Sequence, residues 1–327
     1  MPLTITAAVE RWPVAGQFII ARGAKDCVDV LVVAVSNGTH IGMGEGTAIY
    51  YNDESAESCL AQVMSVAGGL SDMDAPSAKD ALQELLPCGA ARNALDCALW
   101  DVMAKEADLP LWKLIGQEFG PEPLTTAFTI SLGDAATMES DATDAAAQGY
   151  SLLKLKLTGA GDRERVAAVH RGAPIARLIV DANESWGGLD IAGEAEALAA
   201  HGVEMVEQPV KHGSDDALDG VRAGLPIIAD ESCHSASDVT KCASYYDGVN
   251  IKLDKAGGLT EAMKIADAAE EAGLKIMVGC MLSTSLGIAP AFLIAQRADW
   301  VDLDGPALLA QDREEGFQFV SGKVINP

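Results

Sequence analysis

Residues 151–157 read SLLKLKL, a short apolar segment with lysines at positions 154 and 156. Because successive side chains of a strand point to opposite faces, Lys154 and Lys156 share one face, and Leu153, Leu155 and Leu157 share the other. Two lysines inside a barrel cost free energy unless carboxylates or a substrate compensate their charge. The segment therefore predicts a barrel strand with these three leucines against covering helices and its lysines in a charged mouth.

Four later segments repeat this arrangement of an apolar strand that ends in ionisable residues. They read LIVDAN (178–183), MVEQP (205–209), IIADES (227–232) and VNIKLD (249–254). The ionisable groups follow one another at intervals of roughly 25 residues, the length of one βα unit: Lys156, Asp181, Glu207, Asp230 and Lys252. We expect them to converge at the carboxyl-terminal face of a parallel barrel, where barrel enzymes place their active sites.

From about residue 122 onward, short apolar strands alternate with alanine-rich helical stretches. The expected strands cover 125–130, 152–157, 178–181, 203–207, 226–229, 248–252, 275–278 and 300–302. This alternation predicts a βα barrel or an open doubly wound sheet, and eight strands within roughly 200 residues favour the barrel. One helix is expected over 260–272, with Thr260 as its N-cap and Gly273 at its end.

The first 115 residues have a different order, with strands first and helices after them. Strands are expected over 3–9, 29–36 and 39–44, with a hairpin turn at Asn37-Gly38, and helices over 54–67, 77–86 and 90–104. Strands followed by helices indicate an α+β region. We therefore predict an α/β protein: an α+β capping domain over 1–115, which residues 305–327 complete, and a (β/α)7β TIM-like barrel over 116–304.

Composition narrows the classes of partner. The chain of 327 residues has 23 Lys and Arg against 48 Asp and Glu, a net charge of −25. This charge argues against nucleic acid and anionic membranes, because both require a cationic surface. The seven cysteines form no C-x-x-C pair, which argues against a disulfide framework and fits a reducing cytoplasm. No stretch approaches 18 apolar residues, so we expect no membrane span.

Three of the strand-end carboxylates suit a hard, oxygen-preferring cation, because no cysteine or histidine ligand accompanies them. Asp181, Glu207 and Asp230 therefore predict a Mg²⁺ site, with Mn²⁺ as the alternative ion. Lys156 and Lys252 belong to strands at roughly opposite sides of a closed barrel, with the metal strands between them. This layout suits removal of a proton from one face of a carbon beside a carboxylate and return of a proton to the other face.

The ordered strand-end motifs K-x-K, D-x-N, E-Q-P, D-E and K resemble those of the enolase superfamily, specifically its muconate-lactonizing-enzyme-like subgroup. That superfamily combines a Lys or His base with Mg²⁺. The resemblance covers essentially the whole chain, including ARNALDCALWDVMAK at 91–105 and DLDGP at 302–306. The segments IVDANESW, ADESCH, VNIKLDKAGGLTEA and GCMLSTS are similar to those of the bacterial dipeptide epimerases that act on L-Ala-D/L-Glu.

The resemblance implies a role for each candidate residue. Lys156 and Lys252 would be the acid/base catalysts, supported electrostatically by Lys154, and Asp181, Glu207 and Asp230 would bind Mg²⁺. Asp302 and Asp304 are implied to bind the free ammonium group of a dipeptide, and Thr129 is implied to bind its backbone. Arg22 or Lys25 would bind a glutamate side chain, and both lie beside a loop that is implied to close over the site. Ser283 stands where some relatives carry glutamate, a departure that bears on specificity.

The implied function is an isomerase: a Mg²⁺-dependent dipeptide epimerase of cytoplasmic peptidoglycan recycling, working by two-base 1,1-proton transfer through an enediolate. Alternatives within the subgroup are an o-succinylbenzoate synthase, an N-acylamino acid racemase or a cycloisomerase, which have no need of Asp302 and Asp304 for an ammonium group. A rival of another class is a non-catalytic, metal-dependent carboxylate-binding protein, which would tolerate loss of Lys156 and Lys252. We expect a small-molecule substrate and a homo-oligomer.

Overall fold

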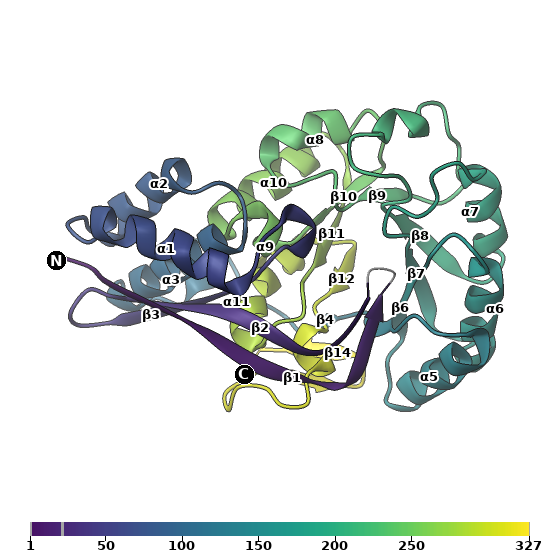
Figure 1. The fold of residues 1–327 in the computed structure, drawn as a ribbon, viewed down its shortest axis with the longest axis horizontal. Helices are drawn as coiled ribbons and strands as arrows, with labels where there is room; N and C mark the ends of the chain where they lie inside the picture. Colours follow the sequence, from purple (N-terminus) through teal and green to yellow (C-terminus); the bar gives the residue numbers. More distant parts are fainter. Residues whose placement is uncertain (1, 21–22, 327) are drawn as a thin grey trace.

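The computed structural model describes residues 2–20 and 23–326, and within them eight parallel strands form a barrel (Figure 1). The strands follow one another around the sheet in chain order: β5 (Phe128–Ile130), β6 (Leu152–Lys156), β7 (Arg177–Asp181), β8 (Val203–Glu207), β9 (Ile227–Ala229), β10 (Gly248–Ile251), β11 (Lys275–Gly279) and β12 (Trp300–Asp302). The first and last strands also meet, since the amide of Ala127 donates to the carbonyl of Val301 at 2.7 Å. The predicted (β/α)7β TIM-like barrel is therefore confirmed.

Helices connect successive strands and cover the outside of the barrel (Figure 1). They are α5 (Ala135–Ala147), α6 (Asp162–Gly172), α7 (Ile191–Ala199), α8 (Ala236–Cys242), the short α9 (Leu253–Ala256), α10 (Leu259–Glu271) and α11 (Ser285–Ile294). The connection between β8 and β9, which the structure describes throughout, has the 3-10 helix η2 (Asp215–Leu218) in place of an α-helix.

The alternation predicted for SLLKLKL is confirmed. Leu153 and Leu155 of β6 belong to the same buried core as Val166 and Val169 of α6, between the strands and the helices. Inside the barrel, a separate apolar layer consists of Ala127, Leu152, Ile179, Met205, Ile228, Met277 and Trp300. Because this layer lies toward the amino-terminal ends of the strands, the charged strand ends are left to form the opposite mouth.

The amino-terminal region is an antiparallel sheet packed against three helices (Figure 1). The strands are β1 (Thr4–Ile20), β2 (Gly23–Ser36) and β3 (Ile41–Thr47), and the helices are α1 (Ala56–Leu70), α2 (Ala75–Leu85) and α3 (Ala90–Glu106). The turn predicted at Asn37 is confirmed, since its Oδ1 accepts the amides of Thr39 and His40 at 3.1 and 2.9 Å.

β1 extends well beyond the predicted 3–9 and β2 begins well before the predicted 29–36, so both predicted strands were too short. Val14 and Val28 pack with Leu282 and Leu309, and this apolar contact stabilises a long hairpin against the barrel. Near its tip, the carbonyl of Ile19 accepts the amide of Leu132 at 2.9 Å. The hairpin thus reaches the loop that follows β5, at the barrel mouth.

Buried polar groups join α3 to the barrel. Oδ2 of Asp96 accepts the amide of Thr260 at 2.9 Å, and Oδ1 accepts its hydroxyl at 2.6 Å. Thr260 was expected to cap its own helix, but α10 begins at Leu259 and Asp96 of α3 caps it instead. Nearby, Oδ1 of Asp254 accepts the amide of Thr47 and the side-chain amide of Asn93 at 2.8 and 2.9 Å.

After β12 the chain returns toward both parts of the molecule. The amide of Ala310 donates to Pro13 of the hairpin at 2.9 Å. Further on, β13 (Gln318–Val320) and β14 (Lys323–Ile325) form a small sheet with β4 (Leu124–Thr125). The domain limits of 1–115 with 305–327, and of 116–304, stay a prediction. No helix among the described residues is long and apolar enough to cross a membrane.

Candidate active site

The five strand-end groups predicted to converge do meet at the carboxyl-terminal mouth of the barrel. Asp181 ends β7, Glu207 ends β8 and Asp230 directly follows β9, and all three are buried. One carboxylate oxygen of each lies within 4.8 Å of the others. Parallel strands bring their carboxyl ends to one edge, which is why residues some 25 positions apart in sequence form one cluster.

Buried lysines compensate these carboxylates. Nζ of Lys156 lies 2.7 Å from Oδ2 of Asp181, and Nζ of Lys252 lies 2.7 Å from Oδ2 of Asp230. Nζ of Lys154 lies 2.7 Å from Oε2 of Glu207. Lys156 and Lys252 therefore approach the carboxylate cluster from different strands, β6 and the end of β10, as the sequence spacing predicts.

The charges of the cluster set the protonation of its members. Burial lowers the pKa of Lys252, but the carboxylates of Asp230 and Glu207 outweigh burial and raise it well above its ordinary value. Burial raises the pKa of Asp230, but the ammonium groups of Lys252 and Lys255 hold it well below its ordinary value. With these pairs intact Lys252 is a proton donor, and a neutral lysine requires that another cation balance the carboxylates.

The carboxylate cluster has the composition of a magnesium site. It offers oxygen donors from three buried carboxylates, the ligands that Mg²⁺ and Mn²⁺ prefer. Amides hold these oxygens in place: Asn250 Nδ2 donates to Oε1 of Glu207 at 2.7 Å, and the amide of Asn183 donates to Oδ1 of Asp181 at 2.9 Å. Such outer contacts orient ligands in protein metal sites. The residues present therefore fit a divalent cation.

Above the carboxylates, residues of the amino-terminal region cover a small hollow. Phe18, Lys25, Tyr50 and Tyr51 line it together with Lys156, Lys252, Asp230 and Glu231. Nζ of Lys25 lies 4.9 Å from the ring centroid of Tyr50, and burial lowers the pKa of Lys25. Among the described residues no carboxylate pairs with Lys25, so this cation is available to a ligand. Arg22, the other candidate for the same role, lies outside the described residues.

A neighbouring hollow contains the residues predicted to bind the amino end of a dipeptide. Thr129, Asp302 and Asp304 line it together with Lys154 and Lys156. Nζ of Lys154 lies 2.7 Å from Oδ2 of Asp302, and the backbone amide of Thr129 donates to Oδ2 of Asp304 at 2.7 Å. Burial, with a smaller contribution from Asp302, raises the pKa of Asp304 to about 7.

The structure does not bring Ser283 into either hollow. Met281 and Leu282 line both of them, whereas Ser283 is buried and packs beside Gly287 and Gly305. The backbone conformation after β11 therefore turns the two preceding residues, and not the serine, toward the cavity.

Several supporting residues have no place among the predicted site residues. Lys255, Gln208 and Asn250 are buried and contact Asp230 or Glu207. Gln208 has φ of 35°, a left-handed conformation that is uncommon outside glycine. This backbone strain lies directly after Glu207, one of the three carboxylates of the cluster. The only sequence signal for Lys255 is a second lysine three residues after Lys252, between the predicted strand 248–252 and the predicted helix 260–272.

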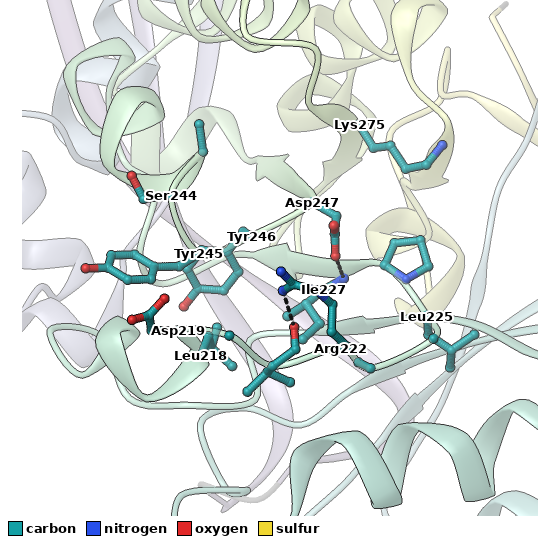
Figure 2. Close-up of a pocket in the computed structure, with 16 residues that line it drawn as sticks. Leu218, Asp219, Arg222, Leu225, Ile227, Ser244, Tyr245, Tyr246, Asp247 and Lys275 are labelled. Atoms are coloured by element: carbon teal, nitrogen blue, oxygen red, sulfur yellow. Dashed lines mark hydrogen bonds between the residues drawn. The ribbon is translucent and has the colours of Figure 1, made fainter.

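A larger hollow lies at the other end of the barrel (Figure 2). Its volume is about 810 Å³, and Ile227, Asp247 and Lys275 line it at the amino-terminal ends of β9, β10 and β11. Figure 2 shows the carboxylate of Asp247 bonded to the amide of Ile227, at 2.8 Å. Parallel barrels place their catalytic groups at the carboxyl ends of strands, so size does not make this hollow the active site.

Two family models match the chain. Residues 3–116 match the model described as "Mandelate racemase / muconate lactonizing enzyme, N-terminal domain", and residues 137–327 match "Enolase C-terminal domain-like".

Curated relatives match over nearly the full chain. The L-Ala-D/L-Glu epimerase of Escherichia coli strain K12 is 42% identical over 321 residues, which cover 98% of this chain and 99% of the relative. The N-acetyl-D-glutamate racemase of a Pseudoalteromonas species is 37% identical over 300 residues, 90% and 92% of the two chains.

Solved structures of similar sequence have the same fold over nearly the full chain. An enolase family member from Agrobacterium tumefaciens, with homology to dipeptide epimerases and with bound sodium and L-Ala-L-Glu, is 41% identical with a TM-score of 0.93, covering 100% of this chain and 98% of the other. The dipeptide epimerase of Methylococcus capsulatus, complexed with Mg and L-Arg-D-Lys, is 31% identical with a TM-score of 0.92, covering 100% and 98%.

Proposed function

Because the chain belongs to the mandelate racemase / muconate lactonizing enzyme family of the enolase superfamily, we propose that it is a Mg²⁺-dependent dipeptide epimerase. Its foremost substrate is the pair L-Ala-D-Glu and L-Ala-L-Glu. The enzyme is an isomerase that inverts the α-carbon of the second residue. One relative at 42% identity carries this activity in its name, and two of the solved structures similar to this chain contain dipeptides.

The observation that carries the proposal is the pair of lysines beside one carboxylate cluster. Lys156 approaches from β6 through Asp181, and Lys252 approaches from the end of β10 through Asp230. One neutral lysine takes the α-proton from one face of the substrate. The other, as an ammonium, returns a proton to the opposite face, and the roles exchange in the reverse direction. A single lysine would restore the configuration that it removed.

Asp181, Glu207 and Asp230 would hold the divalent cation, Mg²⁺ or alternatively Mn²⁺. When bound, such a cation stabilises negative charge that develops on the substrate carboxylate during deprotonation. Lys154 lies 2.7 Å from Glu207 and 3.8 Å from Asp181, and its permanent charge supports an anion at the same place. Burial of the cluster strengthens each of these interactions by excluding water.

The two hollows accept the two ends of a dipeptide. Asp304, beside Asp302 and Thr129, binds the free ammonium group, and the Thr129 side chain contacts the dipeptide backbone. At the other end, Lys25 binds the side-chain carboxylate of glutamate, with Arg22 as the second candidate. Ser283 lines neither hollow, so we assign it no direct contact with the dipeptide.

A second candidate function is racemisation of an N-acylamino acid. A specific observation favours it: Asp302 already forms an ion pair with Lys154, and Asp304 already accepts a hydrogen bond from the backbone amide of Thr129. Neither carboxylate is wholly available to a substrate ammonium. The relative named N-acetyl-D-glutamate racemase shares 37% identity with this chain.

One experiment tests both. L-Ala-L-Glu and N-acetyl-L-Glu are incubated with the Mg²⁺-loaded enzyme in deuterated water, and proton NMR follows the α-proton while chiral chromatography follows the D-isomer. Deuterium at the glutamate α-carbon with formation of L-Ala-D-Glu supports the epimerase. Exchange confined to N-acetylglutamate supports the racemase, and exchange in neither overturns both. The Lys156→Ala/Lys252→Ala variant is the matched blank.

The biological setting follows from the substrate. D-glutamate beside L-alanine is a unit of peptidoglycan, so the enzyme acts on peptides from peptidoglycan turnover. All seven cysteines are free in the structure, which supports a reducing, cytoplasmic location. The net charge of −25 supports neither nucleic acid nor an anionic membrane as a partner. A homo-oligomer stays a prediction, which light scattering of the purified protein tests.

A further inference from the structure

Lys255 lies behind Asp230, on the side away from the cavity. Its side chain is 1% exposed, and it is not among the residues that line either hollow of the site. Nζ lies 2.6 Å from Oδ1 of Asp230 and donates to the carbonyl of the same residue at 2.5 Å. The carbonyls of Asn250 and Cys233 accept from it at 3.0 and 3.1 Å. The three carbonyls use all three donors of the ammonium, so its contact with Oδ1 is an ion pair without a hydrogen bond of its own.

The contacts of Lys255 divide the two oxygens of Asp230 between two lysines. Oδ1 contacts Lys255 on the buried side, and Oδ2 contacts Lys252 in the cavity at 2.7 Å. The backbone of Asp230 is held as well, since its carbonyl accepts from Lys255 and its amide donates to Oε1 of Gln208 at 2.8 Å. The ion pair and the backbone contacts therefore oppose a rotation of the carboxylate that would offer both oxygens to the cavity.

We propose that Lys255 is a positioning residue that fixes Asp230 as a one-oxygen ligand, with Oδ2 toward the cation. The proposal rests on the Mg²⁺ site of the proposed function. It assigns to Lys255 no contact with substrate and no proton transfer. Lys255 acts on the cation only through the orientation of Asp230.

Two physical effects of removing the Lys255 charge have opposite signs. A cation near a metal site repels Mg²⁺, so loss of the charge by itself strengthens Mg²⁺ binding. Loss of an outer contact that orients a ligand weakens metal binding, typically by 10- to 100-fold. The sign of the change in Mg²⁺ affinity therefore separates a positioning residue from a neighbouring charge.

The test uses Lys255→Gln, which removes the charge and keeps two donors for the surrounding carbonyls. Isothermal titration of the chelated full-length protein with MgCl₂ measures the dissociation constant without any turnover. We expect it to rise by about 10-fold or more. An unchanged or tighter dissociation constant overturns the proposal. Lys264→Gln is the control, because Lys264 is an exposed lysine on the adjacent α10 and should leave the constant unchanged.

A double-mutant cycle with Asp230→Asn shows whether the effect passes through Asp230. Lys255→Gln should add less than 2-fold to the dissociation constant in the Asp230→Asn background, and a full additional loss there overturns the proposal. If Asp230→Asn alone leaves Mg²⁺ binding unchanged, the metal site of the proposed function fails. That outcome is distinct from a failure of Lys255→Gln alone.

Lys255→Arg carries the test if the glutamine variant does not fold. It keeps the positive charge, so Coulomb repulsion of Mg²⁺ is unchanged, but its planar fork cannot reproduce the contacts of the ammonium. In a protein with the melting temperature of the wild type, we expect at least 5-fold weaker Mg²⁺ binding. Wild-type binding by this variant would overturn the proposal.

Discussion

Nζ of Lys154 lies 2.7 Å from Oδ2 of Asp302, so a lysine of β6 and an aspartate of β12 form a buried ion pair across the barrel closure. The same ammonium contacts Glu207, which links Asp302 to the carboxylate cluster. The family resemblance implies that Asp302 and Asp304 together bind a substrate ammonium. Because of the ion pair, Asp304 is the carboxylate that is left to bind a substrate ammonium. Asp302 is instead connected, through Lys154, to the carboxylate cluster.

Loss of either proposed acid/base residue should abolish epimerisation in both directions. Lys156→Ala and Lys252→Ala each leave one face of the α-carbon without a proton carrier, and loss of general acid/base catalysis costs about 10²- to 10⁴-fold in rate. Chiral chromatography of both directions measures it. One enantiomer should still exchange its α-proton with deuterated water in each single variant. Near-normal turnover by either variant would refute the two-base mechanism, and Lys275→Ala is the exposed-lysine control.

Removal of divalent cations should abolish activity, and Mg²⁺ should restore it. The three buried carboxylates of the cluster motivate this, because only oxygen donors are present. Turnover of L-Ala-L-Glu is measured after exhaustive chelation and again after addition of MgCl₂ or MnCl₂. Full activity in a protein free of metal by elemental analysis would contradict the metal assignment. Zn²⁺ serves as the comparison ion, since the site lacks nitrogen and sulfur ligands.

Asp304 should set the preference for a free amino terminus. A charged hydrogen bond in a buried site is worth about 1.5–3 kcal/mol. This corresponds to roughly 10- to 150-fold in kcat/KM for L-Ala-L-Glu over its N-acetylated form. Asp304→Asn should remove most of the preference and leave kcat on the acetylated substrate unchanged. If the wild type used both substrates equally, Asp304 would have no role in recognising an ammonium group.

The pH dependence of kcat/KM should report the ionisation of Asp304. Burial raises its pKa to about 7, and only the carboxylate form attracts an ammonium. Therefore kcat/KM for L-Ala-L-Glu should rise with pH through about 7, whereas the N-acetylated dipeptide should lack this step. Asp304→Asn should remove the step as well. A step shared by both substrates would assign it to another group.

Stability should fall as pH rises toward neutrality because of Asp254. Burial raises its pKa from 3.8 to about 7, so the folded state binds a proton more tightly than the unfolded state does. The contribution of Asp254 to the free energy of unfolding is complete below about pH 3.8 and is lost as pH rises to about 7. Because each unit of difference between the folded and unfolded pKa corresponds to 1.36 kcal/mol, this contribution is at most about 4 kcal/mol. Asp254→Asn should flatten this part of the profile of unfolding free energy in urea. Asp267→Asn, at an exposed position, should leave it unchanged. A wild-type slope in Asp254→Asn would show that other groups cause it.

The sequence by itself determined the barrel and the composition of its mouth. The SLLKLKL segment fixes which face of β6 is inside, because side chains alternate along a strand. The regular spacing of Asp181, Glu207 and Asp230 predicts one cluster, since every βα unit returns the chain to the same edge. These features depend on local periodicity, which sequence displays directly.

Only the tertiary structure decided which groups pair within that mouth. The spacing of Lys154 and Asp302, 148 positions apart, carries no signal for their ion pair, because β5 and β12 meet only when the barrel closes. Asp96 replaces Thr260 as the cap of α10 for the same reason. Lys255 falls between the predicted strand 248–252 and the predicted helix 260–272, and its burial against Asp230 follows from packing between distant segments that no local pattern records.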